Sequence, residues 1–123
     1  MEEKKLLLIV DDDKAFADQL SDKAQKVGFN VHVAASGKEA LDYIAEHRVD
    51  FIILDFIMPE MDGYTFYHIL THDMRRQIPA IILTNLKGTQ DKNEELEVFI
   101  KPDTDLDILI GKIKNHLETH PAS

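Results

Sequence analysis

The chain has 123 residues, of which 44% are hydrophobic and 30% are charged, as in one ordinary globular domain. It contains no cysteine, which excludes a disulfide framework and a zinc site built from thiolates. The formal net charge of −9 disfavours nonspecific binding to nucleic acid, and no apolar stretch is long enough for insertion into a membrane.

The first half of the chain predicts two strand–helix pairs. Residues 6–10 form a continuous apolar run, which indicates a strand that is covered on both faces. Apolar side chains at spacings near three and four predict a helix over residues 14–27, which Gly28 ends. A second strand at 29–35 then leads to a second helix at 36–47.

The middle of the chain continues this alternation. A third apolar run at 51–54 predicts a buried strand, and residues 64–73 predict the helix that follows it. Between them, residues 59–63 are typical of a tight turn in which Gly63 supplies a positive φ. A fourth strand is expected at 80–83.

The last third predicts one more strand and one more helix. Residues 85–96 are polar and carry almost no apolar stripe, so the fourth helix of the pattern is expected to be shortened or missing. A short fifth strand is expected at 97–100. A final amphipathic helix is expected over 105–118, with Thr104 as its N-cap.

Strands that alternate with helices are typical of βα units with right-handed crossovers and a parallel sheet. We therefore expect an α/β fold, in which a five-stranded parallel sheet is the middle layer of a three-layer α/β/α sandwich. A single domain is expected over residues 1–123, with its core at about 5–119. The first residues lack the layout of a signal peptide, so a cytoplasmic location is expected.

Polar side chains stand where four of the predicted strands end: Asp11 and Asp12, Asp55, Thr84, and Lys101. The carboxyl ends of parallel strands meet at one edge of a sheet, which is where open α/β sheets bind ligands. Crowded carboxylates repel one another unless a cation compensates, and carboxylate oxygens suit Mg²⁺. A hydroxyl and an ammonium group can bind the oxygens of a phosphoryl group. This pattern predicts an acidic, metal-dependent site for phosphoryl chemistry.

Two simpler interpretations are open for parts of this pattern. The acids at 11 and 12 could be helix caps on a solvated edge, although capping does not account for Asp55, Thr84 and Lys101. Two histidine pairs with the i, i+4 spacing of zinc ligands, His68/His72 and His116/His120, lack a third ligand at motif spacing. Surface histidines are the favoured interpretation.

Four segments are similar, in order and spacing, to the receiver domain of two-component response regulators: Val10–Asp13, Leu54–Gly63, Leu83–Thr84 and Lys101–Pro102. The resemblance covers essentially the whole chain. It implies a flavodoxin-like sheet with the strand order 2-1-3-4-5.

The resemblance implies that Asp55 is the phosphoacceptor. It implies that Mg²⁺ is held directly by Asp12 and Asp55, by Asp11 directly or through water, and by the backbone carbonyl of Ile57. Asp13 is then expected to face solvent or to cap the first helix, because the metal-binding pair of the family matches the two preceding positions.

The same resemblance implies that Lys101 pairs with Asp55 and then with the phosphoryl group, which Thr84 also contacts. The phosphoryl donor is expected to be a sensor histidine kinase or a phosphotransfer protein, and the output is expected to pass to a downstream effector protein. A stand-alone, chemotaxis-regulator-like switch in a phosphorelay is the expected function, without direct binding to nucleic acid and without an enzyme's turnover.

Two departures from the family keep an alternative open, and one of them is the polar segment 85–96 in place of a full fourth helix. The family usually has an aromatic residue three positions before the lysine, where this chain has Val98, and the neighbouring Phe99 has the opposite strand parity. A phosphorylation-independent protein-interaction module of the same fold is therefore the alternative. A phosphohydrolase is disfavoured, because Ile57 stands where such an enzyme has its second aspartate.

Overall fold

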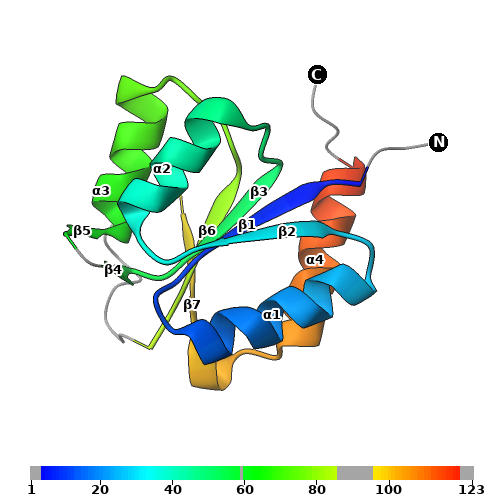
Figure 1. Ribbon diagram of the computed structural model, residues 1–123. Coiled ribbons are helices and arrows are strands. Elements are labelled where there is room, and N and C mark those ends of the chain that lie inside the picture. Colours follow the sequence, from blue (N-terminus) through cyan, green and yellow to red (C-terminus); the bar gives the residue numbers. More distant parts are fainter. Residues whose placement is uncertain (1–3, 59, 86–95, 120–123) are drawn as a thin grey trace.

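The computed structural model describes residues 4–58, 60–85 and 96–119. Its main sheet is parallel and has the strand order β2-β1-β3-β6-β7 (Figure 1). The strands are β1 (Leu6–Val10), β2 (Asn30–Ala34), β3 (Phe51–Leu54), β6 (Ala80–Thr84) and β7 (Glu97–Ile100). This is the predicted order 2-1-3-4-5 when these five strands are counted along the chain.

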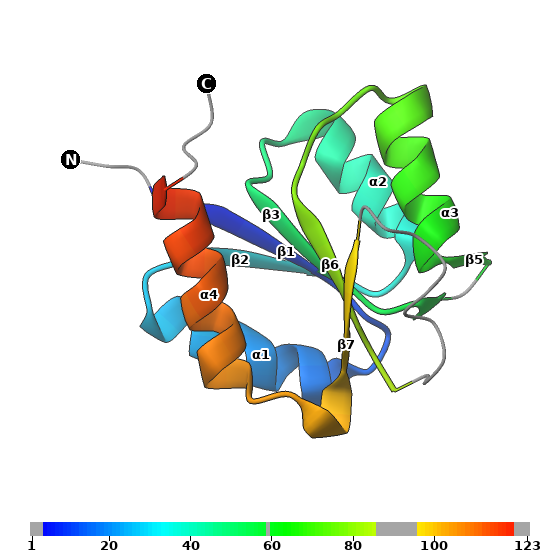
Figure 2. The same cartoon turned by 180° about the vertical axis from the view of Figure 1, so that it is seen from behind.

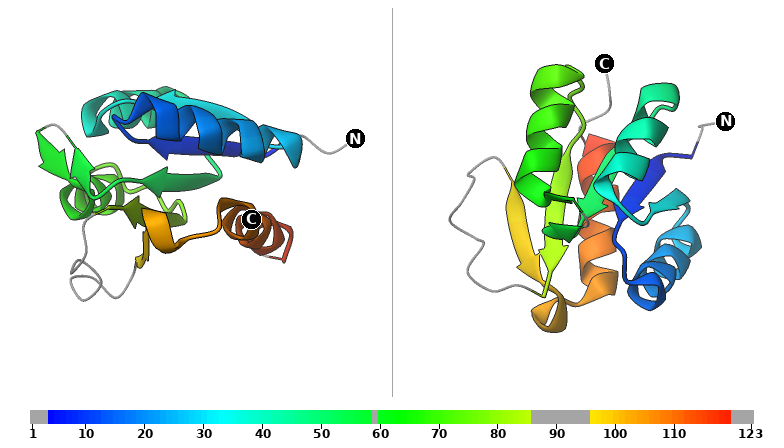
Figure 3. Two further views of the ribbon diagram at one scale, coloured as in Figure 1. Left: turned by 90° about the horizontal axis from the view of Figure 1, so that it is seen from below. Right: turned by 60° about the vertical axis from the view of Figure 1, so that its left-hand side comes forward.

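Helices cover both faces of the sheet: α1 (Lys14–Lys26), α2 (Gly37–Glu46), α3 (Gly63–His68) with a π-helical turn (Ile69–Asp73), and α4 (Leu106–Thr119). Helices α1 and α4 lie on one face, and α2 and α3 lie on the other (Figures 1 and 2). Figure 1 shows the strands between these two pairs of helices, and the view from below in Figure 3 looks onto the face that α1 and α4 cover. Within the described ranges, no helix combines the length and apolar character that a membrane span needs.

The predicted elements agree with the structure to within one residue at each end. Side-chain periodicity explains this agreement, because it depends on residues that are close in sequence. The expected loss or shortening of a helix between β6 and β7 falls on residues 86–95, which lie outside the described residues.

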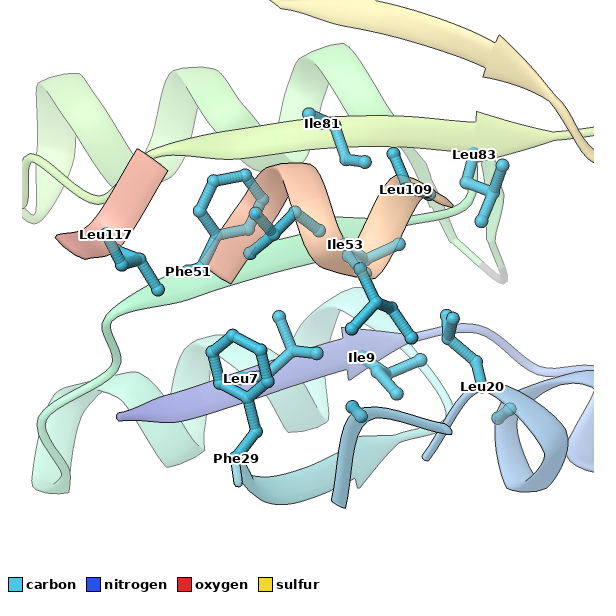
Figure 4. Packing of buried hydrophobic residues seen from close by; sticks show 14 residues of the cluster. Leu7, Ile9, Leu20, Phe29, Phe51, Ile53, Ile81, Leu83, Leu109 and Leu117 are labelled. Carbon is cyan, nitrogen blue, oxygen red and sulfur yellow. The ribbon is translucent and has the colours of Figure 1, made fainter. Parts of the chain in front are cut away.

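Two hydrophobic clusters form the core, one on each face of the sheet. Alternate residues of each strand point to opposite faces, so Leu7 and Ile9 of β1 join one cluster while Leu8 and Val10 join the other. Figure 4 shows the cluster between the sheet and α1 and α4, where Leu20 and Leu109 pack against the strand residues. Burial on both faces explains why the central strands read as continuous apolar runs.

Gly28 ends α1 as predicted. Its φ is +103°, and it follows the C-cap residue Val27. The backbone N–H of Phe29 donates to the carbonyl of Ala24, and the N–H of Gly28 donates to the carbonyl of Gln25. These two bonds form a Schellman motif, which turns the chain toward β2.

The predicted N-cap of the last helix was wrong by one residue. The Asp105 carboxylate accepts hydrogen bonds from the backbone N–H groups of Asp107 and Ile108, at 3.0 and 3.1 Å. The Thr104 hydroxyl instead donates to the carbonyl of Ile100 at 2.8 Å. Asp105 is the cap because its carboxylate reaches the free N–H groups of the first turn of α4, whereas Thr104 is held back against the end of β7.

Candidate functional site

The carboxyl edge of the sheet brings the predicted site residues together. Asp11 follows β1 and Asp55 follows β3, and the register pairs Val10 with Leu54 just before them. Backbone hydrogen bonds continue past the strands, from the Asp11 N–H to the Ala34 carbonyl and from the Asp55 N–H to the Val10 carbonyl. The two acids are therefore fixed side by side by the main chain.

Three carboxylates converge at this edge. One oxygen each from Asp11, Asp12 and Asp55 can be chosen so that all lie within 4.8 Å of one another. Asp11 is buried, Asp55 is half-buried and Asp12 is exposed, so the group opens to solvent on the side of Asp12. The three carboxylates offer only hard oxygen ligands, the donor type that Mg²⁺ accepts.

Lys101 places a positive charge beside these acids. Its Nζ lies 2.7 Å from Asp11 Oδ2 and 3.5 Å from Asp55 Oδ2, and its side chain is 6% exposed. The expected pairing with Asp55 is therefore accompanied by a shorter contact with Asp11. The shorter contact is with Asp11, the more deeply buried of the two carboxylates. A buried negative charge costs more free energy without a nearby cation than an exposed one does.

The protonation of Asp11 reflects this environment. Burial raises the pKa of Asp11 above its ordinary value of 3.8, and the negative charge of Asp55 adds to the increase. Hydrogen bonds from the Lys101 ammonium group and from the Asp13 backbone N–H act in the opposite direction. The ionised form of Asp11 therefore depends on these two donors.

Asp13 has the capping role that was expected of it. Its Oδ1 accepts a hydrogen bond from the Phe16 backbone N–H at 3.1 Å, which caps the first turn of α1. Its own backbone N–H donates to Asp11 Oδ1 at 2.9 Å. The third acid of the run thus supports the site without joining the group of three carboxylates.

A small antiparallel hairpin, which the sequence did not predict, follows Asp55. Its strands are β4 (Ile57–Met58) and β5 (Met61–Asp62). The Ile57 N–H donates to Asp55 Oδ1 at 3.3 Å, so the hairpin touches the acid directly. The assignment of the Ile57 carbonyl as a metal ligand stays a prediction.

The positive φ expected of Gly63 was wrong. Glu60 adopts the positive φ, at 69°, whereas Gly63 begins α3 and donates its N–H to the Phe56 carbonyl at 2.8 Å. A Cβ at Gly63 would lie 2.9 Å from the Leu54 side chain and 3.4 Å from the Asp55 carbonyl oxygen. Glycine is needed there because α3 approaches the end of β3 closely.

Thr84 and its neighbours complete the edge. Thr84 is the last residue of β6 and is 1% exposed, and it lies opposite Ile100 in the ladder with β7. Val98 and Phe99 pack into the clusters on opposite faces of the sheet, as their parity predicts. Val98, at the position where the family usually has an aromatic residue, is therefore a small aliphatic side chain on the face of the sheet that α2 and α3 cover.

The histidine pairs do not form a metal site with the described residues. His68 and His72 stack with ring centroids 4.2 Å apart, and both are exposed. In the described part of the chain, the three carboxylates are the only group of three or more histidine, aspartate or glutamate ligands that could converge on a metal ion. His120 of the other pair lies outside the described residues.

Phe16 is a site residue that the sequence did not identify. Lys101 Nζ lies 4.2 Å from the centre of its ring, within the range of a cation–π contact. In the sequence, Phe16 is one apolar position of the α1 stripe, and nothing in that pattern distinguishes it from a core residue. The only available signal is its position, in the first turn after the acidic run.

The crowding of like charges leads to a first testable prediction. We expect Asp12→Asn to raise the free energy of unfolding by up to about 1 kcal/mol in the presence of a chelator, because one negative charge leaves the group. Urea unfolding at low and high salt measures the change, and salt should reduce the gain.

Asp22→Asn is the matched control for this prediction. Asp22 is exposed on α1 and lies outside the group of carboxylates, and its replacement changes the net charge equally. An equal gain in both variants would mean that the overall charge of −9, and not the local group, causes the effect.

Comparisons with known proteins agree with this geometry. The family model described as "Response regulator receiver domain" matches residues 7–101. The probable transcriptional regulator ycf27 of Cyanidium caldarium is 35% identical, over 94% of this chain and 49% of that protein. Response regulator Rre1 of Synechocystis is 33% identical, over 95% of this chain and 53% of that protein. The chain thus spans about half the length of these two curated relatives.

Solved structures show the same likeness. The receiver domain of the Francisella response regulator 1452 is 32% identical, with a TM-score of 0.83, and the match covers 94% of this chain and 98% of that chain. A signal receiver domain of a histidine kinase from Syntrophus aciditrophicus is 30% identical, with a TM-score of 0.82, and the match covers 97% of this chain and 94% of that chain. Both likenesses extend over nearly the full length of the fold described above.

Proposed function

This chain belongs to the response regulator receiver domain family, and we propose that it accepts a phosphoryl group on Asp55 as a switch in two-component signalling. The proposed donor is a phosphohistidine of a sensor kinase or phosphotransfer protein in the cytoplasm. The proposed recipient of the signal is a downstream effector protein. We propose that one receiver domain accounts for the chain, with its core at about residues 5–119.

The observation that carries this proposal is the meeting of opposite charges at the carboxyl edge of the sheet. Asp55 belongs to a group of three acids, and the ammonium group of Lys101 lies beside two of them. A capping role would not bring a buried lysine to the same place. Attack on a phosphoryl group, in contrast, needs both a carboxylate nucleophile and positive charge near the transferred oxygens.

The two oxygens of Asp55 have different surroundings. Oδ1 accepts the N–H of Ile57, and Oδ2 faces Lys101 Nζ at 3.5 Å. In the proposed transfer, one carboxylate oxygen forms a bond to phosphorus, the bond from phosphorus to the imidazole nitrogen breaks, and the bonding electron pair leaves with that nitrogen. The product is an acyl phosphate on Asp55.

Mg²⁺ is the cofactor that fits the donor set. We propose that the carboxylates of Asp11, Asp12 and Asp55 and the carbonyl of Ile57 hold it, since the three acids present hard oxygen ligands within 4.8 Å. When bound, the ion supplies positive charge to the oxygens of the phosphoryl group. The exposed side of the group, at Asp12, leaves room for water and phosphate ligands.

Lys101 and Thr84 are the proposed contacts of the transferred group. The ammonium group of Lys101 already lies near Asp55, and the Thr84 residue ends the next strand of the sheet. A cation and a hydroxyl donor at these positions stabilise the charge that spreads over the phosphoryl oxygens during transfer. Repeated turnover of small phosphoesters is not proposed, because Ile57 cannot act as the second acid.

A second candidate function is docking to partners without phosphorylation, and Val98 at the usual aromatic position favours it. Incubation with acetyl phosphate and Mg²⁺, followed by intact-mass measurement, separates the two functions. We expect the mass of one phosphoryl group to be added with Mg²⁺ and not with a chelator. A protein that gains no mass under either condition would support the docking module.

A further inference from the structure

Phe16 makes a contact that its place in the core does not explain. The residue lies in the first turn of α1 and packs, partly buried, against the cluster between the sheet and α1 and α4. Its ring also faces Lys101 Nζ, 4.2 Å from the ring centre. A core residue needs only apolar neighbours, whereas this ring is directed at the charged end of a lysine.

Four contacts connect Phe16 to the acids in a closed circuit. The Phe16 N–H donates to Asp13 Oδ1, and the Asp13 N–H donates to Asp11 Oδ1. Asp11 Oδ2 contacts Lys101 Nζ at 2.7 Å, and Nζ returns to the Phe16 ring. The backbone of the loop before α1 and the end of β7 are therefore joined through one ring and one ammonium group.

We propose that Phe16 is a positioning residue for Lys101. The lysine stem has four rotatable bonds, and the electron-rich face of the ring restricts where its ammonium group can lie. Nζ lies over the ring and at the same time within 2.7 Å of Asp11 Oδ2 and 3.5 Å of Asp55 Oδ2. This inference rests on the proposed function, in which Lys101 binds the transferred phosphoryl group.

The consequence concerns the rate of phosphorylation. Nζ lies closer to Asp11 than to Asp55. In the proposed reaction it must move from Asp11 toward the phosphoryl oxygens on Asp55. A ring that covers the ammonium group keeps it at the site during this short movement and keeps water from one side of it. Without the ring, Lys101 samples more conformations, and fewer of them place Nζ where charge develops.

Three variants test the inference. We expect Phe16→Leu, which keeps an apolar side chain but removes the ring, to lower the rate of phosphorylation by acetyl phosphate about five- to thirtyfold. Phe16→Tyr keeps the ring, so its rate should stay near that of the wild type. Phe29→Leu is the matched control, because Phe29 belongs to the same cluster and is buried, while the cation–π contact of Lys101 is with Phe16.

A structural role and a positioning role give different results. If Phe16 only fills the core, Phe16→Leu and Phe29→Leu should both lose stability and both keep the phosphorylation rate per folded molecule. That result would overturn the inference. So would a rate for Phe16→Tyr that is as low as the rate for Phe16→Leu.

NMR spectroscopy provides a readout that does not depend on phosphorylation. The ring should shift the Lys101 Hε resonances to lower frequency, and Phe16→Leu should remove this shift while Phe29→Leu should keep it. If the wild type takes up no phosphoryl group, the proposed function fails and the NMR shift decides the position of Lys101 by itself. An unshifted Lys101 resonance in the wild type would also overturn the inference.

Discussion

Asp55→Asn should lower the rate of phosphorylation by acetyl phosphate at least about 1,000-fold, because a carboxamide oxygen is a poor nucleophile. Asparagine has nearly the shape of aspartate, so the Ile57 N–H keeps an oxygen acceptor at this position. The variant should therefore fold normally. Intact-mass measurements over time, with Mg²⁺ present, give the rate for the variant and the wild type.

Asp13→Asn is the control for this result. Asp13 lies only two residues after Asp11, yet it caps α1 and stands outside the three convergent carboxylates. Asparagine is an equally good N-cap, so this variant should keep both its stability and its phosphorylation. Undiminished phosphorylation of Asp55→Asn would mean that another side chain accepts the phosphoryl group.

Lys101→Met should destabilise the protein by about 3–5 kcal/mol at neutral pH in the presence of a chelator, because it leaves a buried carboxylate without its cation. Lys101 and Asp11 are both nearly inaccessible, with side chains 6% and 4% exposed. Methionine keeps most of the lysine stem and packs well on the Phe16 ring, so the change mainly removes charge. Urea unfolding measures the loss.

This loss should depend on pH in a defined direction. The folded-state pKa of Asp11 is already raised above 3.8 by burial, and removal of Lys101 raises it further. A raised carboxyl pKa gives a contribution to stability that is present below 3.8 and is lost as the pH rises through the folded-state pKa. The difference between Lys101→Met and the wild type should therefore be largest near neutral pH and should shrink toward pH 3.8.

The double variant Asp11→Asn/Lys101→Met separates charge from packing. It removes the buried negative charge together with the cation, so most of the stability lost in Lys101→Met should return at neutral pH. A loss that is the same at every pH, and that the double variant does not recover, would mean that the lysine stem and not its charge stabilises this edge of the sheet.

Sequence periodicity was sufficient to predict the layers of the fold. Strands that are buried on both faces need unbroken apolar runs, and the helices need one apolar stripe, so 6–10 and 14–27 could be recognised from neighbouring residues alone. The convergence of Asp11 and Asp55 could also be predicted, because each follows a strand and parallel strands place their carboxyl ends at one edge.

Contacts between side chains far apart in sequence needed the tertiary structure. The contact of Lys101 with Asp11 depends on how far β1 and β7 each extend toward the carboxyl edge of the sheet. These two strands are not neighbours in the sheet. The ring of Phe16 meets Lys101 because α1 and the end of β7 lie on the same side of that edge. Neither contact leaves a local pattern in the chain.

The same division holds for the turns. Gly28 could be recognised as the end of α1, because a Schellman motif is closed by bonds within six residues. Gly63 was assigned the wrong role. Glycine is required there because α3 approaches Leu54 and Asp55 too closely for a Cβ, and not because the backbone has a positive φ. The sequence alone therefore determined the five strands of the main sheet, the helices that cover it, their order along the chain and the acids at the sheet edge, since these follow from short-range sterics and solvent exclusion. The pairing of Lys101 and the role of Gly63 were decided by the packing of distant segments, which sets distances that no short stretch of sequence contains.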